Sequence, residues 1–174
     1  MGATSSDEGE IELPQRLYLD TQFCVAYHWR GDRDHPAASR FALVLKQLAE
    51  ANAINCYVSA LVLDELAWKL GGIIYDRDNG RGSWQSAPSK KNAFRTVKDE
   101  VAGRTEDFLY EPWLRALGIP DTAYYAIPTL MRRYSLCSAD LCHLAWATTA
   151  GCGIITNDAD FHRLRNPSVH VVGY

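Results

Sequence analysis

The stretch from Ser138 to Phe161 reads SADLCHLAWATTAGCGIITNDADF and is the most informative part of the chain. Its first half, SADLCHLAWATTAG, predicts a helix that is capped near Ser138, and CGIIT after it predicts a buried strand. Two carboxylates, Asp158 and Asp160, follow this strand directly. A helix that leads into a buried strand with an acidic end is typical of a parallel sheet covered by helices.

Two more strand-to-helix units precede this stretch. RLYLD at residues 16–20 predicts a short strand that ends in a carboxylate, and TQFCVAYHW predicts the next helix, with Thr21 as a candidate N-cap. INCYV at residues 54–58 predicts a strand, and Ser59 is expected to cap ALVLDELAWKL, a helix that stops at Gly71 and Gly72. SVHVVGY predicts a last strand. The alternation implies a three-layer α/β/α fold with a mainly parallel central sheet flanked by helices.

Length and composition favour one domain. The chain has 174 residues, of which 47% are hydrophobic. We expect residues 1–15 to form a disordered polar tail and residues 16–174 to form one domain with a long helical and loop insertion at about 71–125. Within it, the glycine-rich run from Gly71 to about Pro88 predicts a loop or mobile segment anchored by Trp84, and no third strand can be assigned. No membrane span or signal peptide is apparent, so we expect a cytoplasmic protein.

The charge and the cysteines narrow the class of protein. A net charge of −3 does not favour a general nucleic-acid binder, so any such partner would be held by local basic patches. The five cysteines are odd in number and form no C-x-x-C pair, which favours reduced core thiols over disulfides or a zinc site. The five histidines show no metal-ligand spacing, so we interpret them as surface or core residues.

Carboxylates from four separate elements are expected to meet at one edge of the sheet. Asp20 ends the first strand and Asp158 follows CGIIT, and the carboxyl ends of parallel strands lie together. Asp140 lies in a first helical turn, where the helix dipole stabilises an anion. Glu65 lies within the helix after the second strand, and periodicity alone does not separate it from Asp64. Such acids repel one another unless a hard divalent cation, Mg²⁺ or Mn²⁺, neutralises them.

Each acid also has a simpler structural explanation, which the sequence alone leaves open. The order of the acids and their positions at strand ends favour a shared site. The simpler roles are a helix cap for Asp20, a solvated partner of Lys69 for Glu65, a first-turn acid for Asp140, and turn formation for Asp158 and Asp160.

Taken together, LYLDT, VSALVLDELAWKL, YSLCSADLCHLAWATTAGCGIITNDADF and the closing β-run resemble the ordered motifs of PIN-domain ribonucleases, in particular the toxin subunits of VapBC-type toxin–antitoxin pairs. The resemblance covers most of the chain from Arg16 onward, and it implies a PIN-like fold and a metal-dependent endoribonuclease that uses Mg²⁺ or Mn²⁺. The catalytic and metal-binding acids that it implies are Asp20, Glu65, Asp140 and Asp158. It also implies an extra acid, Asp160, and a hydroxyl residue, Thr156, that orients a carboxylate or a water.

The same resemblance implies partners. These are an RNA substrate, a cognate antitoxin protein and a second copy of the chain in a homodimer. Solvated helix faces explain the basic residues at least as well as RNA binding does. The candidates for RNA phosphates are Lys90, Lys91, Arg95, Lys98, Arg132 and Arg133. Tyr124 and Tyr125 could stack on bases, but we expect them to pack in the core.

Two alternatives to an active ribonuclease come from other classes of protein. One is a catalytically inactive PIN-like RNA-binding or regulatory module, which only a cleavage assay can distinguish. The other is an aspartate-based phosphatase of the haloacid dehalogenase type, because Asp20 ends a first strand. That chemistry requires a second acid two residues later, where this chain has Gln22.

Overall fold

The computed structural model describes residues 13–164 and 169–174, so most of the expected N-terminal tail, residues 1–12, lies outside the described part. Its strands form one five-stranded parallel sheet in the order β3-β2-β1-β4-β5. Parallel pairing throughout agrees with the alternation of strands and helices in the sequence. The strands are β1 (Arg16–Leu19), β2 (Asn55–Val58), β3 (Leu114–Ala116), β4 (Gly153–Ile155) and β5 (Val171–Val172).

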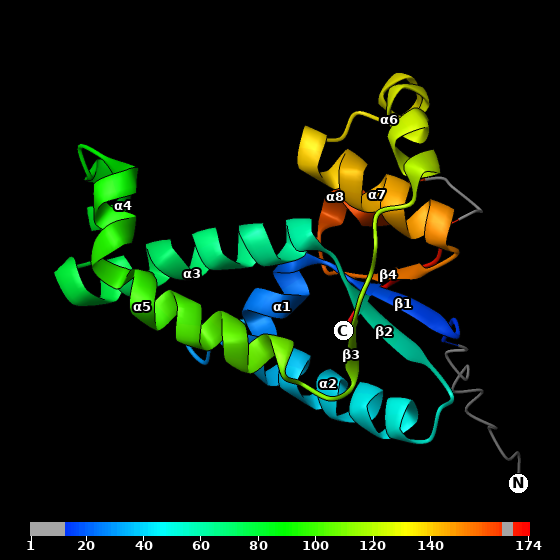
Figure 1. Ribbon diagram of the computed structural model, residues 1–174, viewed down its shortest axis with the longest axis horizontal. Helices are drawn as coiled ribbons and strands as arrows, with labels where there is room; N and C mark the ends of the chain where they lie inside the picture. Colours follow the sequence, from blue (N-terminus) through cyan, green and yellow to red (C-terminus); the bar gives the residue numbers. More distant parts are fainter. Residues whose placement is uncertain (1–12, 165–168) are drawn as a thin grey trace, which may run out of the picture.

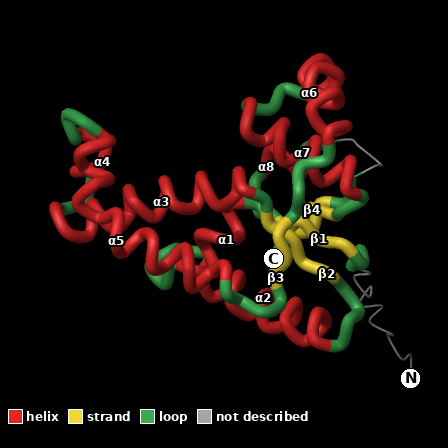
Figure 2. The backbone as a smooth tube through the Cα atoms, in the orientation of Figure 1, coloured by secondary structure: helices red, strands yellow, loops and turns green. Residues whose placement is uncertain are grey.

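Helices cover both faces of the sheet, as the three-layer expectation required. In Figure 1, α6 and α7 lie on one side of the strands and α1 and α2 on the other, and Figure 2 shows the strands between these layers. Helices α3 and α5 pair and extend away from the sheet as a hairpin. The helices are α1 (Thr21–His28), α2 (His35–Glu50), α3 (Ala60–Asn79), α4 (Ser83–Ser86), α5 (Lys90–Leu109), α6 (Asp121–Arg133), α7 (Ser138–Ala150) and α8 (Ala159–His162).

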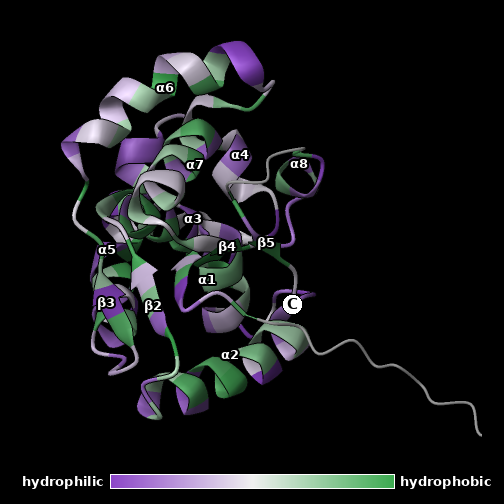
Figure 3. Cartoon of the chain, turned by 90° about the vertical axis from the view of Figure 1, so that its right-hand side faces the viewer, coloured by the Kyte–Doolittle hydropathy of each residue, from purple (hydrophilic) through white to green (hydrophobic). Residues whose placement is uncertain are grey.

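The core is centred on β1. Leu17, Tyr18 and Leu19 have no exposed surface, because β1 pairs with β2 on one edge and β4 on the other and is covered by helices on both faces. Figure 3 shows the layers from the side, with α6 and α7 on one side of the strands, α2 on the other, and hydrophobic colour along parts of α7 and α2. Across the described ranges, no helix has both the length and the hydropathy needed to cross a bilayer.

The strand order creates a crevice between β1 and β4. The chain winds from β1 to β2 and β3 in one direction, and then returns to place β4 and β5 on the other side of β1. At such a switch point the two crossover connections run to opposite faces, which opens a crevice beyond the carboxyl ends of the strands. Asp20 follows β1 and Asp158 follows β4, so both stand at this crevice.

The prediction of a loop from Gly71 to about Pro88 is wrong. Helix α3 continues through both glycines to Asn79, and α4 follows after a short turn. A Cβ atom on Gly71 would lie 2.6 Å from a ring carbon of Phe94, and one on Gly72 would lie 3.2 Å from Trp84. These glycines therefore allow aromatic rings to pack against α3 and do not end it.

Two helix caps also differ from the expectation. Asp20, and not Thr21, is the N-cap of α1, and its carboxylate accepts from the Thr21 N–H. Cys137 is the N-cap of α7 and makes no side-chain capping bond, so Ser138 is the first helical residue. The Ser59 cap is confirmed, because its hydroxyl accepts from the backbone N–H of Val62.

The strand that could not be assigned is β3. It has three residues and forms the edge of the sheet beside β2, and Arg115 and Ala116 within it are exposed. An edge strand of this length has one paired side and little buried surface. It therefore lacks the apolar run or the alternation that marks a strand in a sequence.

Candidate active site

A pocket of about 420 Å³ lies at the crevice between β1 and β4. We refer to it as the acid pocket, because the four predicted carboxylates all line it. They come from the ends of β1 and β4 and from α3 and α7, so elements far apart in the sequence build one wall. The lining residues are Asp20, Gln22, Asp64, Glu65, Trp68, Lys69, Cys137, Ala139, Asp140 and Asp158.

Asp20 is the most buried of these acids, with 6% of its surface exposed. The Thr21 N–H donates to its Oδ1 at 2.7 Å, and the Thr156 hydroxyl donates to its Oδ2 at 2.8 Å. Burial raises the pKa of Asp20, and the nearby His143 and the bonds from Thr156 and Thr21 offset this only in part. The carboxylate is fixed in position, but its negative charge is only partly compensated by the protein.

Glu65 lies on α3, on the other side of Thr21. Its Oε2 accepts from the Thr21 hydroxyl at 2.5 Å and lies 3.1 Å from Nε2 of His143. The hydrogen bond with His143 lowers the pKa of Glu65, and the bond from Thr21 adds to this, whereas burial acts in the opposite direction. Glu65 is therefore ionised at neutral pH, and one of its oxygens is held in place.

A buried hydrogen-bond chain stands behind Glu65. His143 is 1% exposed, and its Nδ1 lies 2.7 Å from the Tyr18 hydroxyl, which is itself 2.7 Å from the Ser59 hydroxyl. Because a carboxylate can only accept, the hydrogen of the Glu65 contact is on Nε2 of His143. The chain connects the core to the pocket, and it orients the Glu65 carboxylate.

The sequence alone did not connect His143 with the site, because the histidines show no metal-ligand spacing. It is buried, as expected of a core residue, but it also contacts a predicted catalytic acid. The sequence spacing could have indicated this contact. His143 follows Asp140 by three positions, so both residues lie on the same side of α7.

Asp140 and Asp158 are half-buried at the pocket wall. Asp140 accepts from the Cys137 thiol at 3.0 Å, and this bond is the main cause of a raised pKa for Cys137. Asp158 accepts from the backbone N–H of Asp160 at 2.8 Å as the N-cap of α8, and its own N–H donates to Thr156. Asp158 therefore both forms the turn before α8 and lines the acid pocket.

Asp160 lies apart from the other acids. Its side chain is exposed, and it pairs with Arg163 at 3.1 Å. It does not line the acid pocket. Thr156 is fully buried, and its hydroxyl joins the loops after β1 and β4 through the bond to Asp20.

The predicted basic residues fall into two groups, on α5 and on α6, and Lys98 in the first group pairs with Asp99 at 3.8 Å. Lys91 and Arg95 are exposed on α5 and line a second pocket beside the acid pocket. Lys90 instead donates to the backbone carbonyls of Trp84 and Gln85. The second group lies on α6, whose residues do not line the acid pocket; it comprises Arg132 and Arg133.

The expectation that Tyr124 and Tyr125 pack in the core is wrong. They lie on the outer side of α6 and are 57% and 82% exposed. Helix α6 packs on α7 through a face that includes Ala123 and Leu130, which leaves these tyrosines facing outward.

The donor atoms of the acid pocket fit a hard divalent cation. Its four predicted ligands are carboxylates, and Asp20 among them has a charge that the protein compensates only in part. Within residues 13–164 and 169–174, no three carboxylate, imidazole or thiol groups form a preformed metal-binding cluster. One Glu65 oxygen is already engaged by Thr21 and His143, so a cation would be bound through the remaining carboxylate oxygens.

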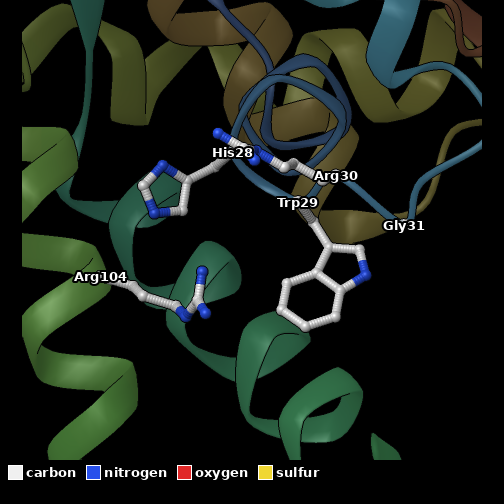
Figure 4. Close-up of a pocket in the computed structure, with 5 residues that line it drawn as sticks. All are labelled: His28, Trp29, Arg30, Gly31 and Arg104. Atoms are coloured by element: carbon white, nitrogen blue, oxygen red, sulfur yellow. The ribbon is translucent and has the colours of Figure 1, made fainter.

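A separate pocket of about 450 Å³ lies at the opposite end of α1. His28, Trp29, Arg30, Gly31 and Arg104 surround it, as Figure 4 shows, and the Arg104 guanidinium carbon lies 5.2 Å from the centroid of a Trp29 ring. These five residues provide basic and aromatic groups but no carboxylate. The acid pocket is therefore the better candidate for metal-dependent chemistry.

Comparison with protein families identifies the class of protein. The family model of the PIN domain matches residues 17–167, which is most of the chain. The chain therefore belongs to the PIN domain family, whose members include nucleases.

Solved structures extend the comparison to toxin–antitoxin proteins. VapBC2 from Rickettsia felis, bound to a DNA fragment from its promoter, matches with a TM-score of 0.59, 16% identity, and coverage of 91% of this chain and 98% of that chain. VapC20 of Mycobacterium tuberculosis, a toxin that cleaves the sarcin-ricin loop, matches with a TM-score of 0.55 and 17% identity. The match covers 88% of this chain and 98% of that chain. FitAcB from Neisseria gonorrhoeae matches with a TM-score of 0.50, 17% identity, and coverage of 89% of this chain and 95% of that chain. At these identities the likeness is one of fold. No curated protein matches the chain.

Proposed function

We propose that the protein is a Mg²⁺- or Mn²⁺-dependent endoribonuclease that hydrolyses phosphodiester bonds at the acid pocket. The observation that carries the proposal is the convergence of acids from four elements at the β1/β4 switch point. The residues that would hold the metal and act in catalysis are Asp20, Glu65, Asp140 and Asp158. Membership of the PIN domain family supports the same function.

The chain's own residues prepare this pocket for a charged substrate. Thr156 and the Thr21 N–H hold both oxygens of Asp20, and Thr21 and His143 hold Glu65, so the two carboxylates are preorganised. A bound divalent ion supplies charge neutralisation for the scissile phosphate and activates a water, so no side-chain nucleophile is required. Hydrolysis of this kind leaves a 5′-phosphate and a 3′-hydroxyl.

We further propose that the protein is the toxin of a toxin–antitoxin pair. The support is the fold that it shares with VapBC2 and with the RNA-cleaving VapC20. In this proposal residues 16–174 form a single cytoplasmic nuclease domain, a cognate antitoxin restrains it, and two copies of the chain form a homodimer. Expression of the chain alone should arrest growth, and co-expression of a small neighbouring reading frame should relieve the arrest. Unimpaired growth on expression of active chain would contradict the toxin role.

The nuclease proposal is tested by cleavage of a mixed pool of structured RNAs. We expect cuts with Mg²⁺ or Mn²⁺, no cuts with EDTA, and loss of cutting in Asp20→Asn and in Asp140→Asn. Asp160→Asn is the matched control, because it removes the same charge at an exposed position outside the pocket. Mapping should give 5′-phosphate ends. RNA binding without cleavage in either metal would favour the inactive regulatory module.

A further inference from the structure

A second pocket, of about 480 Å³, adjoins the acid pocket, and Trp68 lies between the two. Two helices build it with the same spacing: residues i, i+3 and i+4 of α3 face residues i, i+3 and i+4 of α5. We refer to it as the aromatic pocket. Its lining residues are Asp64, Ala67 and Trp68 from α3 and Lys91, Phe94 and Arg95 from α5.

Trp68 is held in place although 48% of its surface is exposed. Its ring lies nearly parallel to that of Phe94, with centroids 5.9 Å apart at 18°, and meets Trp84 edge-on at 5.0 Å and 71°. Gly71 and Gly72 allow those two rings to approach α3. An exposed indole that other rings hold in position offers a flat apolar surface without an entropic cost of ordering it.

Cations predominate on the rim of the aromatic pocket, which carries Lys91, Arg95 and one carboxylate, Asp64. Lys91 and Arg95 are both exposed, and neither forms an ion pair with a carboxylate in the part of the chain that the structure describes. Exposed cations that stand one turn apart beside an aromatic ring suit a polymer that alternates phosphates and bases.

The aromatic pocket shares a wall with the proposed catalytic site. Asp64 and Trp68 line both pockets, and Trp68 follows Glu65 by three residues on α3. A nucleic acid with one phosphate at the acids would therefore bring a neighbouring nucleotide to the indole. The two cations of the rim and the shared wall favour RNA over an apolar peptide as the occupant.

We propose that Trp68, with Lys91 and Arg95, forms a subsite that stacks one unpaired base of the RNA beside the phosphate that is cut. The inference rests on the proposed function for the identity of the ligand, and it assigns a specificity-determining role to the α3–α5 hairpin. Stacking accepts any base, so the subsite selects an unpaired nucleotide and not a particular sequence.

The first test measures binding of a short, fluorescently labelled single-stranded RNA in EDTA, so that cleavage plays no part. We expect Trp68→Ala to weaken binding by about tenfold and Trp68→Phe by much less, because phenylalanine retains an aromatic face. Tyr125→Ala is the matched control, since it removes an exposed aromatic ring that does not line either pocket. Wild-type affinity in Trp68→Ala would overturn the proposal.

The second test identifies the stacked base. Abasic nucleotides are placed at each position of the RNA in turn, and each RNA is titrated with the wild type and with Trp68→Ala. One abasic position should cost the wild type about tenfold in affinity and cost the variant nothing further, because both changes remove the same stack. Losses that add fully at every position would overturn the proposal.

The third test uses a double variant that keeps the aromatic cluster intact and removes the two cations of the rim. The double change Lys91→Gln with Arg95→Gln should flatten the dependence of affinity on salt by about one to two in the logarithmic slope. An unchanged slope would show that these cations do not meet phosphates, and it would overturn their part in the subsite. Circular dichroism of each variant shows whether the hairpin remains folded.

The subsite and the nuclease can fail separately. Metal-dependent cleavage combined with wild-type RNA affinity in Trp68→Ala would remove the subsite and leave the nuclease. Base-dependent binding through Trp68 without any cleavage would support the subsite and remove the nuclease. Binding of an antitoxin-type peptide that depends on Trp68, with RNA binding unchanged, would overturn the proposal in favour of a protein-docking surface.

Discussion

Replacement of Asp20 by asparagine should stabilise the protein at neutral pH in the absence of divalent metal. Asp20 is 6% exposed, and burial raises its pKa despite favourable contacts. Folding therefore places a charge in a site that only partly compensates it. Asparagine is a good helix N-cap and can retain the bond from the Thr21 N–H. The variant keeps the shape of the site but buries no charge.

The size of the effect follows from the contacts. The bonds from Thr21 and Thr156, at 2.7 and 2.8 Å, are hydrogen bonds to a charged group, each worth about 1.5–3 kcal/mol. Removal of a carboxylate from water costs several kcal/mol, roughly as much as both bonds together, and the raised pKa shows that this cost prevails. We expect the variant to gain about 2 kcal/mol, which corresponds to about 4–8 °C in the midpoint of thermal unfolding for a chain of this length.

The pH dependence of this gain has a definite sign. Above the raised folded-state pKa, Asp20 is ionised in both the folded and the unfolded chain, so the full cost of burying its charge is present. As the pH falls through that pKa toward the usual value of 3.8, the wild type takes up a proton on folding and the cost disappears. The advantage of Asp20→Asn should therefore grow as the pH rises from about 4 toward the raised folded-state pKa, and it should fade as the pH falls to about 4.

Thermal melts in EDTA at neutral and acidic pH measure the effect. Asp160→Asn is the matched control: it removes the same charge at an exposed site and should shift the stability by no more than about 0.5 kcal/mol. An Asp20→Asn variant that is less stable than the wild type at neutral pH would refute the reasoning, as would a gain that persists below about pH 4. Saturating Mg²⁺ should stabilise the wild type by about 2–3 kcal/mol at roughly 100-fold excess over its dissociation constant, and the variant much less.

Three further predictions concern packing, capping and orientation. Gly71→Ala should destabilise the protein by about 1–3 kcal/mol in urea unfolding, because its Cβ would lie 2.6 Å from Phe94. Ser59→Ala should cost about 1–2 kcal/mol in the same assay, since it removes a buried helix cap. Thr156→Val should lower the rate of RNA cleavage by about tenfold or more with little effect on RNA binding in EDTA, because it releases one oxygen of Asp20.

Each of these predictions has a control variant, for which we expect either the opposite effect or no effect. A Cβ atom on Gly103, which lies in α5, would have no neighbouring atom within 4 Å, so Gly103→Ala should stabilise the helix by about 0.5–1 kcal/mol. A Gly71→Ala variant that is as stable as Gly103→Ala would contradict the packing argument. Ser59→Asn should retain the cap, and Thr156→Ser should retain the hydroxyl and the activity. Equal loss in Thr156→Ser and Thr156→Val would contradict the orienting role.

Local patterns were sufficient for the central strands and for the positions of the acids that follow β1 and β4. The strand β1 is buried on both faces, so its residues must be a continuous apolar run, and Asp20 at its end is recognisable for the same reason. The Asp158 position follows from the equally buried β4. Parallel strands bring their carboxyl ends to one edge, and this general rule is enough to predict that both acids line one pocket.

Positions whose conformation depends on distant partners could not be predicted in this way. Gly71 and Gly72 carry a local signal for the end of a helix, but the rings of Phe94 and Trp84 pack over them and α3 continues. Local capping preference likewise favours Ser138 over Cys137, but Cys137 is the N-cap of α7. Local propensities are worth about 1 kcal/mol or less per residue, and the burial of one aromatic ring exceeds them.

The amino-acid sequence by itself determined the layered α/β architecture, the acids at the ends of β1 and β4, and the family, because these depend on residue types in a short window and on their order. Only the tertiary structure decided that His143 orients Glu65, that Asp160 stands outside the pocket, and that Trp68 lies between two pockets. Each of these facts is a distance between residues on different elements. Such distances are set by the packing of helices on the sheet, which no local pattern contains.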